Sequence, residues 1–175
     1  MRKDLNYIVQ FKGLSEGSHE FNFEIEDDFF VGLDYSEISK GDLKSRVILF
    51  KHPTFLELEV KIDGWVNVPC DLCLEEFKQD LHYNGKLFVK FGNELTEEDD
   101  VMVIPVEEHE IDLSHYLYES INLSLPYKKV HPRDEEGNLT CNKEMLEKLE
   151  EYSISERRDN NDPRWDKLKN FLSNN

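Results

Sequence analysis

Alternation of apolar and charged side chains is clearest between residues 56 and 63, where every second position is apolar and the positions between are charged. This period of two predicts a β-strand with one buried face. After Gly64 the alternation resumes through Val66 and Val68 up to Cys70. Similar alternation or short apolar runs predict further strands around residues 7–11, 21–25, 47–49, 75–91 and 101–106.

Two later segments follow the helical period instead. Residues 112–125 predict a helix with Leu117 and Ile121 facing inward, and Asp112 is the expected N-cap. Residues 142–152 predict a shorter helix, because their apolar side chains recur on one face. The segment between these two helices is polar and irregular.

Strands come early in the chain and helices come late, which favours an α+β fold over a parallel α/β fold. We expect a largely antiparallel sheet of five to seven strands, with helices on one side or appended at the C-terminus. Residues 1–152 are expected to form a single domain. Residues 153–175 are expected to form a linker followed by a C-terminal amphipathic helix, which Asp162 and Pro163 would open.

The charge of the chain limits its partners. Lys and Arg total 21 and Asp and Glu total 38, so the net charge is -17. Such a surface repels phosphate backbones, which argues against broad nucleic-acid binding. No apolar run approaches the ~20 residues of a membrane-spanning helix, and the first residues lack the apolar stretch of a signal peptide. We therefore expect a cytoplasmic protein without membrane contact, whose three cysteines stay reduced.

The stretch VPCDLCLEEF places two cysteines at the expected turn between two antiparallel strands. A Cys-x-x-Cys turn can supply two of the four ligands of a tetrahedral Zn²⁺ site. The irregular segment 127–141 supplies a histidine and the third cysteine, and a metal can hold a loop that has little core of its own. The predicted ligands of a structural zinc are Cys70, Cys73, His131 and Cys141.

Two other interpretations of the thiols stay open. Cysteine is among the most buried residue types, so the pair could simply belong to the core. Alternatively, Cys70 and Cys73 could form the reactive pair of a thiol redox protein. Against the redox interpretation, Asp71, Glu75 and Glu76 place negative charge beside the thiols, which disfavours the thiolate.

Several stretches together resemble one known family. VPCDLCLEEF resembles the C-x-R-C-L-E signature of the YceD family, and IDLSHYLYESINLSLP resembles its second block, a helix with an acidic cap that runs into Leu-x-Leu-Pro. HPRDEEGNLTCNKEMLEKLEE and DPRWDKLKNF resemble the tail of the family, so the resemblance covers about residues 41–171. It implies a bacterial cytoplasmic protein with a role in ribosome biogenesis, linked to accumulation of large-subunit ribosomal RNA. It supplies no mechanism.

The chain departs from the pattern of the family at two places. Leu72 stands where the family often has arginine, which removes a positive charge beside the thiols. Many members carry more cysteines in the tail, whereas this chain has only His131 and Cys141 in that region. A site made of four cysteines is therefore out of reach, and His131 becomes necessary if zinc is bound.

Two routes lead from these features to a ribosomal partner. Acidic runs at 97–100 and 107–110 could bind a basic ribosomal protein or a precursor of the large subunit, which agrees with the sign of the net charge. Direct RNA contact would be local, because it would need a metal to gather the cations of segment 127–143 near the thiol turn. Solvated charges that balance the neighbouring acids are the alternative interpretation of these cations: Lys128, Lys129, Arg133 and Lys143.

Three common enzyme motifs are missing from the sequence. It contains no phosphate-binding G-x-x-x-x-G-K-S/T loop, no G-x-G-x-x-G and no G-x-S-x-G. We therefore expect a non-catalytic protein with no catalytic residue, and the thiol redox protein remains the alternative.

Overall fold

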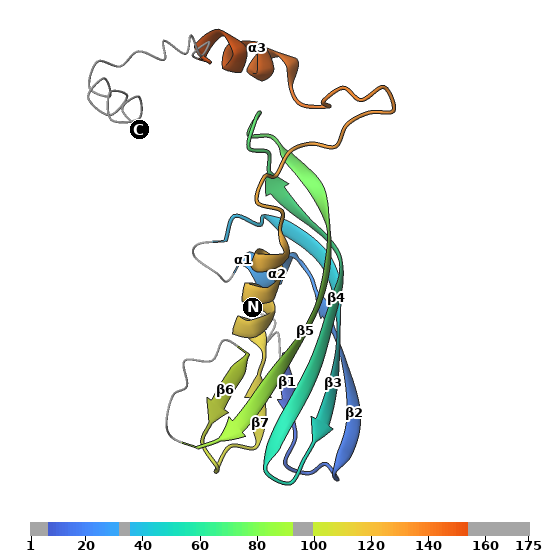
Figure 1. The fold of residues 1–175 in the computed structure, drawn as a ribbon, viewed down its shortest axis with the longest axis vertical. Helices are drawn as coiled ribbons and strands as arrows, with labels where there is room; N and C mark the ends of the chain where they lie inside the picture. Colours follow the sequence, from blue (N-terminus) through green and yellow to red (C-terminus); the bar gives the residue numbers. More distant parts are fainter. Residues whose placement is uncertain (1–6, 32–35, 93–99, 154–175) are drawn as a thin grey trace, which may run out of the picture.

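A five-stranded sheet dominates the computed structural model, which describes residues 7–31, 36–92 and 100–153 (Figure 1). Its strand order is β2-β3-β4-β5-β6, and all neighbours are antiparallel except β5 and β6, which are parallel. The strands are β2 (Gly17–Ile25), β3 (Lys40–Lys51), β4 (Phe55–Pro69), β5 (Glu76–Phe91) and β6 (Val101–Ile104). The predicted α+β class with a largely antiparallel sheet is confirmed.

One face of this sheet forms the core together with two helices. The alternating apolar residues of β4 are fully buried, as their period of two predicts. Helices α1 (Asp27–Val31) and α2 (Ser114–Ser124) lie on the same side of the sheet (Figure 1). Phe30 of α1 and Leu117 and Ile121 of α2 enter the same apolar cluster as β4, which confirms the predicted inward face of the second helix.

The long pairing of β4 with β5 fixes the place of the thiol turn. Their antiparallel register runs from Phe55 opposite Lys90 to Pro69 opposite Glu76. The chain therefore reverses within residues 70–75, at one end of the sheet. The predicted position of both cysteines at a turn between antiparallel strands is confirmed.

Helix α2 begins two residues later than predicted, because Asp112 belongs to a short strand. That strand, β7 (Glu110–Asp112), pairs with β1 (Ile8–Gln10) and sets Ile111 opposite Val9 in the core. The N-cap position is occupied by Leu113, but the carboxylate of Asp112 still accepts hydrogen bonds from the backbone N and the hydroxyl of Ser114, at 2.8 and 2.6 Å. Burial of Ile111 thus outweighs the capping preference of Asp112.

Helix α3 (Lys143–Tyr152) confirms the shorter predicted helix, and Asn142 is its N-cap. The helix expected from Asp162 lies outside the described residues, as do residues 97–99 of the first acidic run. The division between residues 1–152 and 153–175 therefore stays a prediction. Over residues 7–31, 36–92 and 100–153, no helix is long and apolar enough to cross a membrane.

The first prediction concerns Gly64, where the backbones of β4 and β3 approach each other closely. Gly64 of β4 lies opposite Leu43 with φ +148°, and a Cβ there would collide with the carbonyl oxygen of Asp42. We expect Gly64→Ala to lower the free energy of unfolding by about 3 kcal/mol, measured by urea denaturation. Gly13→Ala is the control, because nothing lies within 4 Å of its Cβ. Equal losses in both variants would contradict the strain at Gly64.

Candidate metal centre

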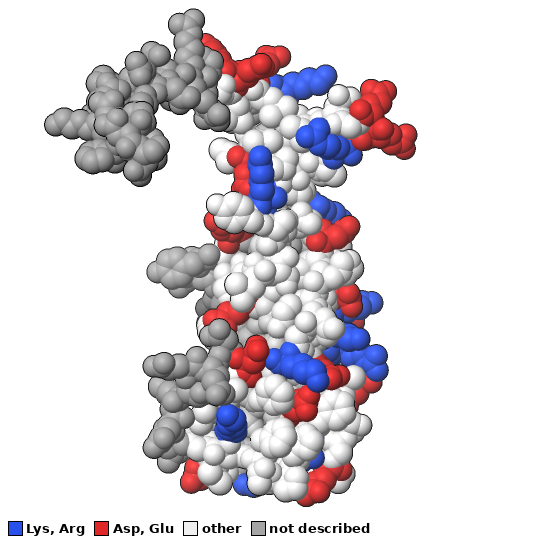
Figure 2. All heavy atoms as spheres, in the orientation of Figure 1, with Lys and Arg blue, Asp and Glu red and all other residues white. Residues whose placement is uncertain are grey.

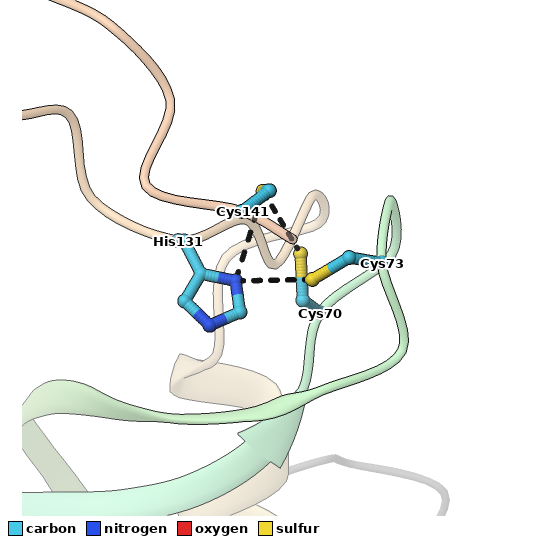
Figure 3. Close-up of side chains that lie close together, drawn as sticks. All are labelled: Cys70, Cys73, His131 and Cys141. Atoms are coloured by element: carbon cyan, nitrogen blue, oxygen red, sulfur yellow. Dashed lines mark hydrogen bonds between the residues drawn. The ribbon is translucent and has the colours of Figure 1, made fainter. Parts of the chain in front are cut away.

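The turn between β4 and β5 directs two sulfurs to the same side. The backbone N of Cys70 donates to the carbonyl of Glu75 at 3.0 Å, and Leu74 N donates to the carbonyl of Cys70 at 2.9 Å. The backbone N of Leu72 donates to the sulfur of Cys70 at 3.4 Å. Leu74 has a φ of 63°, a left-handed conformation that is uncommon for leucine and that completes the reversal. The sulfurs of Cys70 and Cys73 consequently lie next to each other (Figure 3).

A pair of reciprocal hydrogen bonds joins this turn to the segment that carries the other two ligands. Asp71 N donates to the carbonyl of Lys129 at 2.7 Å, and Lys129 N donates to the carboxylate of Asp71 at 2.7 Å. The ammonium of Lys129 also pairs with Glu37 at 2.7 Å. We call this arrangement the Asp71–Lys129 clasp. It positions His131 two residues further along the chain.

The ring of His131 is held between an aromatic side chain and the thiols. Its centroid lies 4.8 Å from that of Phe77, which supports one side of the ring. Its Nδ1 lies 3.4 Å from the sulfur of Cys73 and 3.7 Å from the sulfur of Cys141. The sulfurs of Cys70 and Cys141 are 3.7 Å apart. Figure 3 shows the four side chains converging from the turn and from the loop.

These distances fit a tetrahedral zinc ion. One ligand atom from each residue lies within 4.8 Å of all the others. With bonds of about 2.3 Å to sulfur and about 2.0 Å to nitrogen, tetrahedral angles separate two sulfurs by about 3.8 Å and a sulfur from a nitrogen by about 3.5 Å. All three cysteines are buried and His131 is half-buried. The four predicted ligands therefore lie together, with the donor types and spacing of a structural zinc site.

The thiols of the cluster differ in acidity. Burial raises the pKa of the Cys70 thiol, but hydrogen bonds from the amides of Cys73 and Leu72 and from His131 outweigh burial and lower this pKa to about 6. Hydrogen bonds to the sulfur, rather than the charge of the neighbouring carboxylates, therefore determine the pKa of Cys70. Burial raises the pKa of Cys141 to about 11, and the neighbouring sulfurs add to this effect. A central cation favours the deprotonated form of each thiol.

The predicted cations lie at the same end of the molecule, but two of them already have partners. Lys129 forms the ion pair with Glu37, and its side chain is only 18% exposed. Arg133 donates to the carbonyl of Gly137 at 2.6 Å, which closes the loop before Cys141. Lys128 and Lys143 are exposed. Acidic and basic side chains lie side by side around this end (Figure 2), and phosphate binding by the four cations stays a prediction.

Three supporting contacts of the site were not predicted from the sequence. They are the Asp71–Lys129 clasp, the Phe77–His131 ring contact and a 2.7 Å hydrogen bond from the amide of Asn142 to Glu75. Each contact joins the thiol turn or the strand after it to a segment more than fifty residues away in sequence. In the sequence, only the position of Asp71 between the two cysteines indicates one of these contacts. From the sequence alone, Asp71 is instead interpreted as a negative charge that disfavours the thiolate.

Comparison with known proteins identifies one family. A family model described as large ribosomal RNA subunit accumulation protein YceD matches residues 58–172. The matched region begins within β4 and includes all four clustered residues as well as α3. No curated protein and no solved structure matches the chain.

The clasp generates the second prediction. Asp71→Ala removes the acceptor of the Lys129 amide and should lower the free energy of unfolding by about 1 kcal/mol, because this charge-assisted hydrogen bond is exposed. Asp80→Ala is the matched control on β5, with an exposed carboxylate, and should change stability by less than about 0.5 kcal/mol. Urea denaturation measures both variants. A loss for Asp71→Ala no larger than that of the control would show that the carboxylate of Asp71 does not stabilise the loop.

Proposed function

Because the chain belongs to the YceD family, we propose that it is a non-catalytic factor of the bacterial cytoplasm that supports accumulation of large-subunit ribosomal RNA. A structural zinc held by Cys70, Cys73, His131 and Cys141 would stabilise the end of the protein that carries α3. The observation that carries the proposal is the convergence of these four residues inside the region that matches the family.

A structural role of the metal agrees with the closed donor set. Catalytic zinc sites commonly keep an open position for water or substrate, whereas structural sites fill all four positions with protein ligands. Three buried cysteines and one half-buried histidine supply all four positions in this chain. The loop from Tyr127 to Cys141 contributes few core residues of its own, so a metal would replace the apolar packing that this segment lacks.

The partner that agrees with the charge of the chain is a basic ribosomal protein or a precursor particle that exposes one. A net charge of -17 speeds encounter with a positively charged surface and repels bare RNA. Direct RNA contact would centre on Lys128 and Lys143, which are exposed and take part in neither the clasp nor the Arg133–Gly137 hydrogen bond.

One observation favours a thiol redox protein as the second candidate. The lowered pKa of Cys70 favours its thiolate, which is the nucleophile in disulfide exchange. Its thiolate would attack a disulfide of another molecule, and Cys73 would resolve the mixed disulfide by releasing the reduced partner. Burial of both sulfurs opposes this exchange, because Cys70 is 0% and Cys73 is 3% exposed.

The third prediction concerns the metal. The purified protein should contain one zinc per chain by elemental analysis, and His131→Gln should lose it. Removal of zinc by a chelator should lower the free energy of unfolding by about 3 kcal/mol or more, since the ion binds only the folded chain. It should also expose the loop before α3 to protease.

The matched control for this experiment is His115→Gln, which changes an exposed histidine of α2 and should keep the metal. Equal zinc content and equal stability in both variants would exclude the metal site. Rapid formation of a Cys70–Cys73 disulfide in the purified protein, with turnover of a disulfide substrate, would instead support the redox candidate.

The fourth prediction concerns the partner. In a sucrose gradient of bacterial lysate, the protein should sediment with precursors of the large subunit at low salt and less so at moderate salt, because salt screens charge attraction. Lys128→Ala combined with Lys143→Ala should change the bound fraction by less than twofold if a protein is the partner. A large loss in this variant would favour RNA contact, and absence of the wild-type chain from every precursor fraction would contradict the proposed function.

A further inference from the structure

Helix α3 carries an apolar stripe that the described part of the chain covers only near its first turn. Met145 and Leu146 are half-buried and pack against the core. Leu149 and Tyr152 continue the same stripe, but they are 44% and 79% exposed. No residue of α3 is buried. A helix of ten residues is too short to be stable alone in water, so it depends on the contacts of its first turn.

That first turn is held firmly. The side chain of Asn142 accepts hydrogen bonds from the backbone N of Glu144 and Met145 and donates to Glu75 beside the thiol turn. Cys141, the residue before Asn142, belongs to the metal cluster. The helix is consequently fixed at its start and extends beyond the end of the sheet (Figure 1). Its second half is presented to solvent in one defined orientation.

The charge of α3 decides which class of molecule can cover the stripe. Residues 144–151 contain four glutamates and one lysine, and Lys148 pairs with Glu144 at 2.8 Å. Glu147, Glu150 and Glu151 are all exposed. An acidic helix is repelled by nucleic acids and by anionic lipid surfaces, which attract basic helices instead. A basic protein with an apolar groove bordered by Lys and Arg fits both features. The groove would bury the apolar stripe, and its basic border would pair with the glutamates of α3.

We propose that α3 docks through Leu149 and Tyr152 into such a groove on a basic protein of the large ribosomal subunit. The inference rests on the proposed function and names the surface by which it is performed. An amphipathic helix bound in a groove places side chains at i, i+3, i+4 and i+7 in the partner, and Met145, Leu149 and Tyr152 have this spacing. The partner would also cover the exposed ring of Tyr152, a residue type that is enriched among interface hot spots.

The fifth prediction tests the occupant of the stripe directly. A photoreactive benzophenone amino acid is placed at position 152 of the full chain and, as a control, at position 147 on the opposite side of α3. The probe is the mixture of basic proteins extracted from purified large subunits, and crosslinked peptides are identified by mass spectrometry. Position 152 should crosslink to one basic protein beside a cluster of its Lys or Arg residues, and position 147 should not. Crosslinks from position 152 to residues 154–175, to a second copy of the chain, or to nothing would each overturn the proposal.

A pair of variants measures the contribution of the stripe. Leu149→Ala combined with Tyr152→Ala should weaken binding to the crosslinked protein at least tenfold, with zinc content and circular dichroism unchanged. Glu147→Ala should change this affinity less than threefold. If the double variant binds and sediments with precursor particles as the wild type does, docking through α3 is overturned while the proposed function stands. If the wild type itself is missing from those particles, the proposed function fails.

Discussion

Strands β4 and β5 pair as far as Pro69 and Glu76, and the structure of the end that carries the thiol turn depends on this pairing. The two strands leave only residues 70–75 to reverse the chain, so Cys70 and Cys73 project from the end of a rigid sheet. The Asp71–Lys129 clasp then brings the later segment against this turn, and His131 and Cys141 complete the cluster. Because the clasp and the Phe77–His131 contact use no metal, they arrange the donors in advance and reduce the ordering that binding must impose.

Two kinds of interaction thus hold the segment after α2. Hydrogen bonds define where it lies, and coordination would supply the binding energy that its sparse core cannot. The same segment contains three of the four predicted cations, and two of these already have partners: Lys129 pairs with Glu37, and Arg133 donates to the carbonyl of Gly137. The ion pair with Glu37 weakens the attraction of Lys129 for phosphate, whereas Arg133, whose partner is a neutral carbonyl, keeps its positive charge.

The sequence predicted the features that depend on local period or on residue type. Alternation at residues 56–63 predicted β4, helical spacing predicted α2, and the soft donor types predicted the four clustered residues. The strand β7 was missed because three residues carry too little pattern, and only pairing with β1 gives it a strand conformation. The role of Asp71 was missed for the same physical reason, since its partner is a backbone group 58 positions away.

The length of the sheet has a consequence for how the molecule would fail. Strand β5 has sixteen residues, so at about 3.3 Å per residue it is about 50 Å long. The ligand cluster lies beyond the Glu76 end of this strand. The β1–β7 pair lies toward the other end, where Phe11, just after β1, contacts Phe91 of β5 (Figure 1). Local melting at the cluster would therefore leave the remainder folded. If zinc is bound as proposed, its loss would release the orientation of α3 while the sheet stays folded.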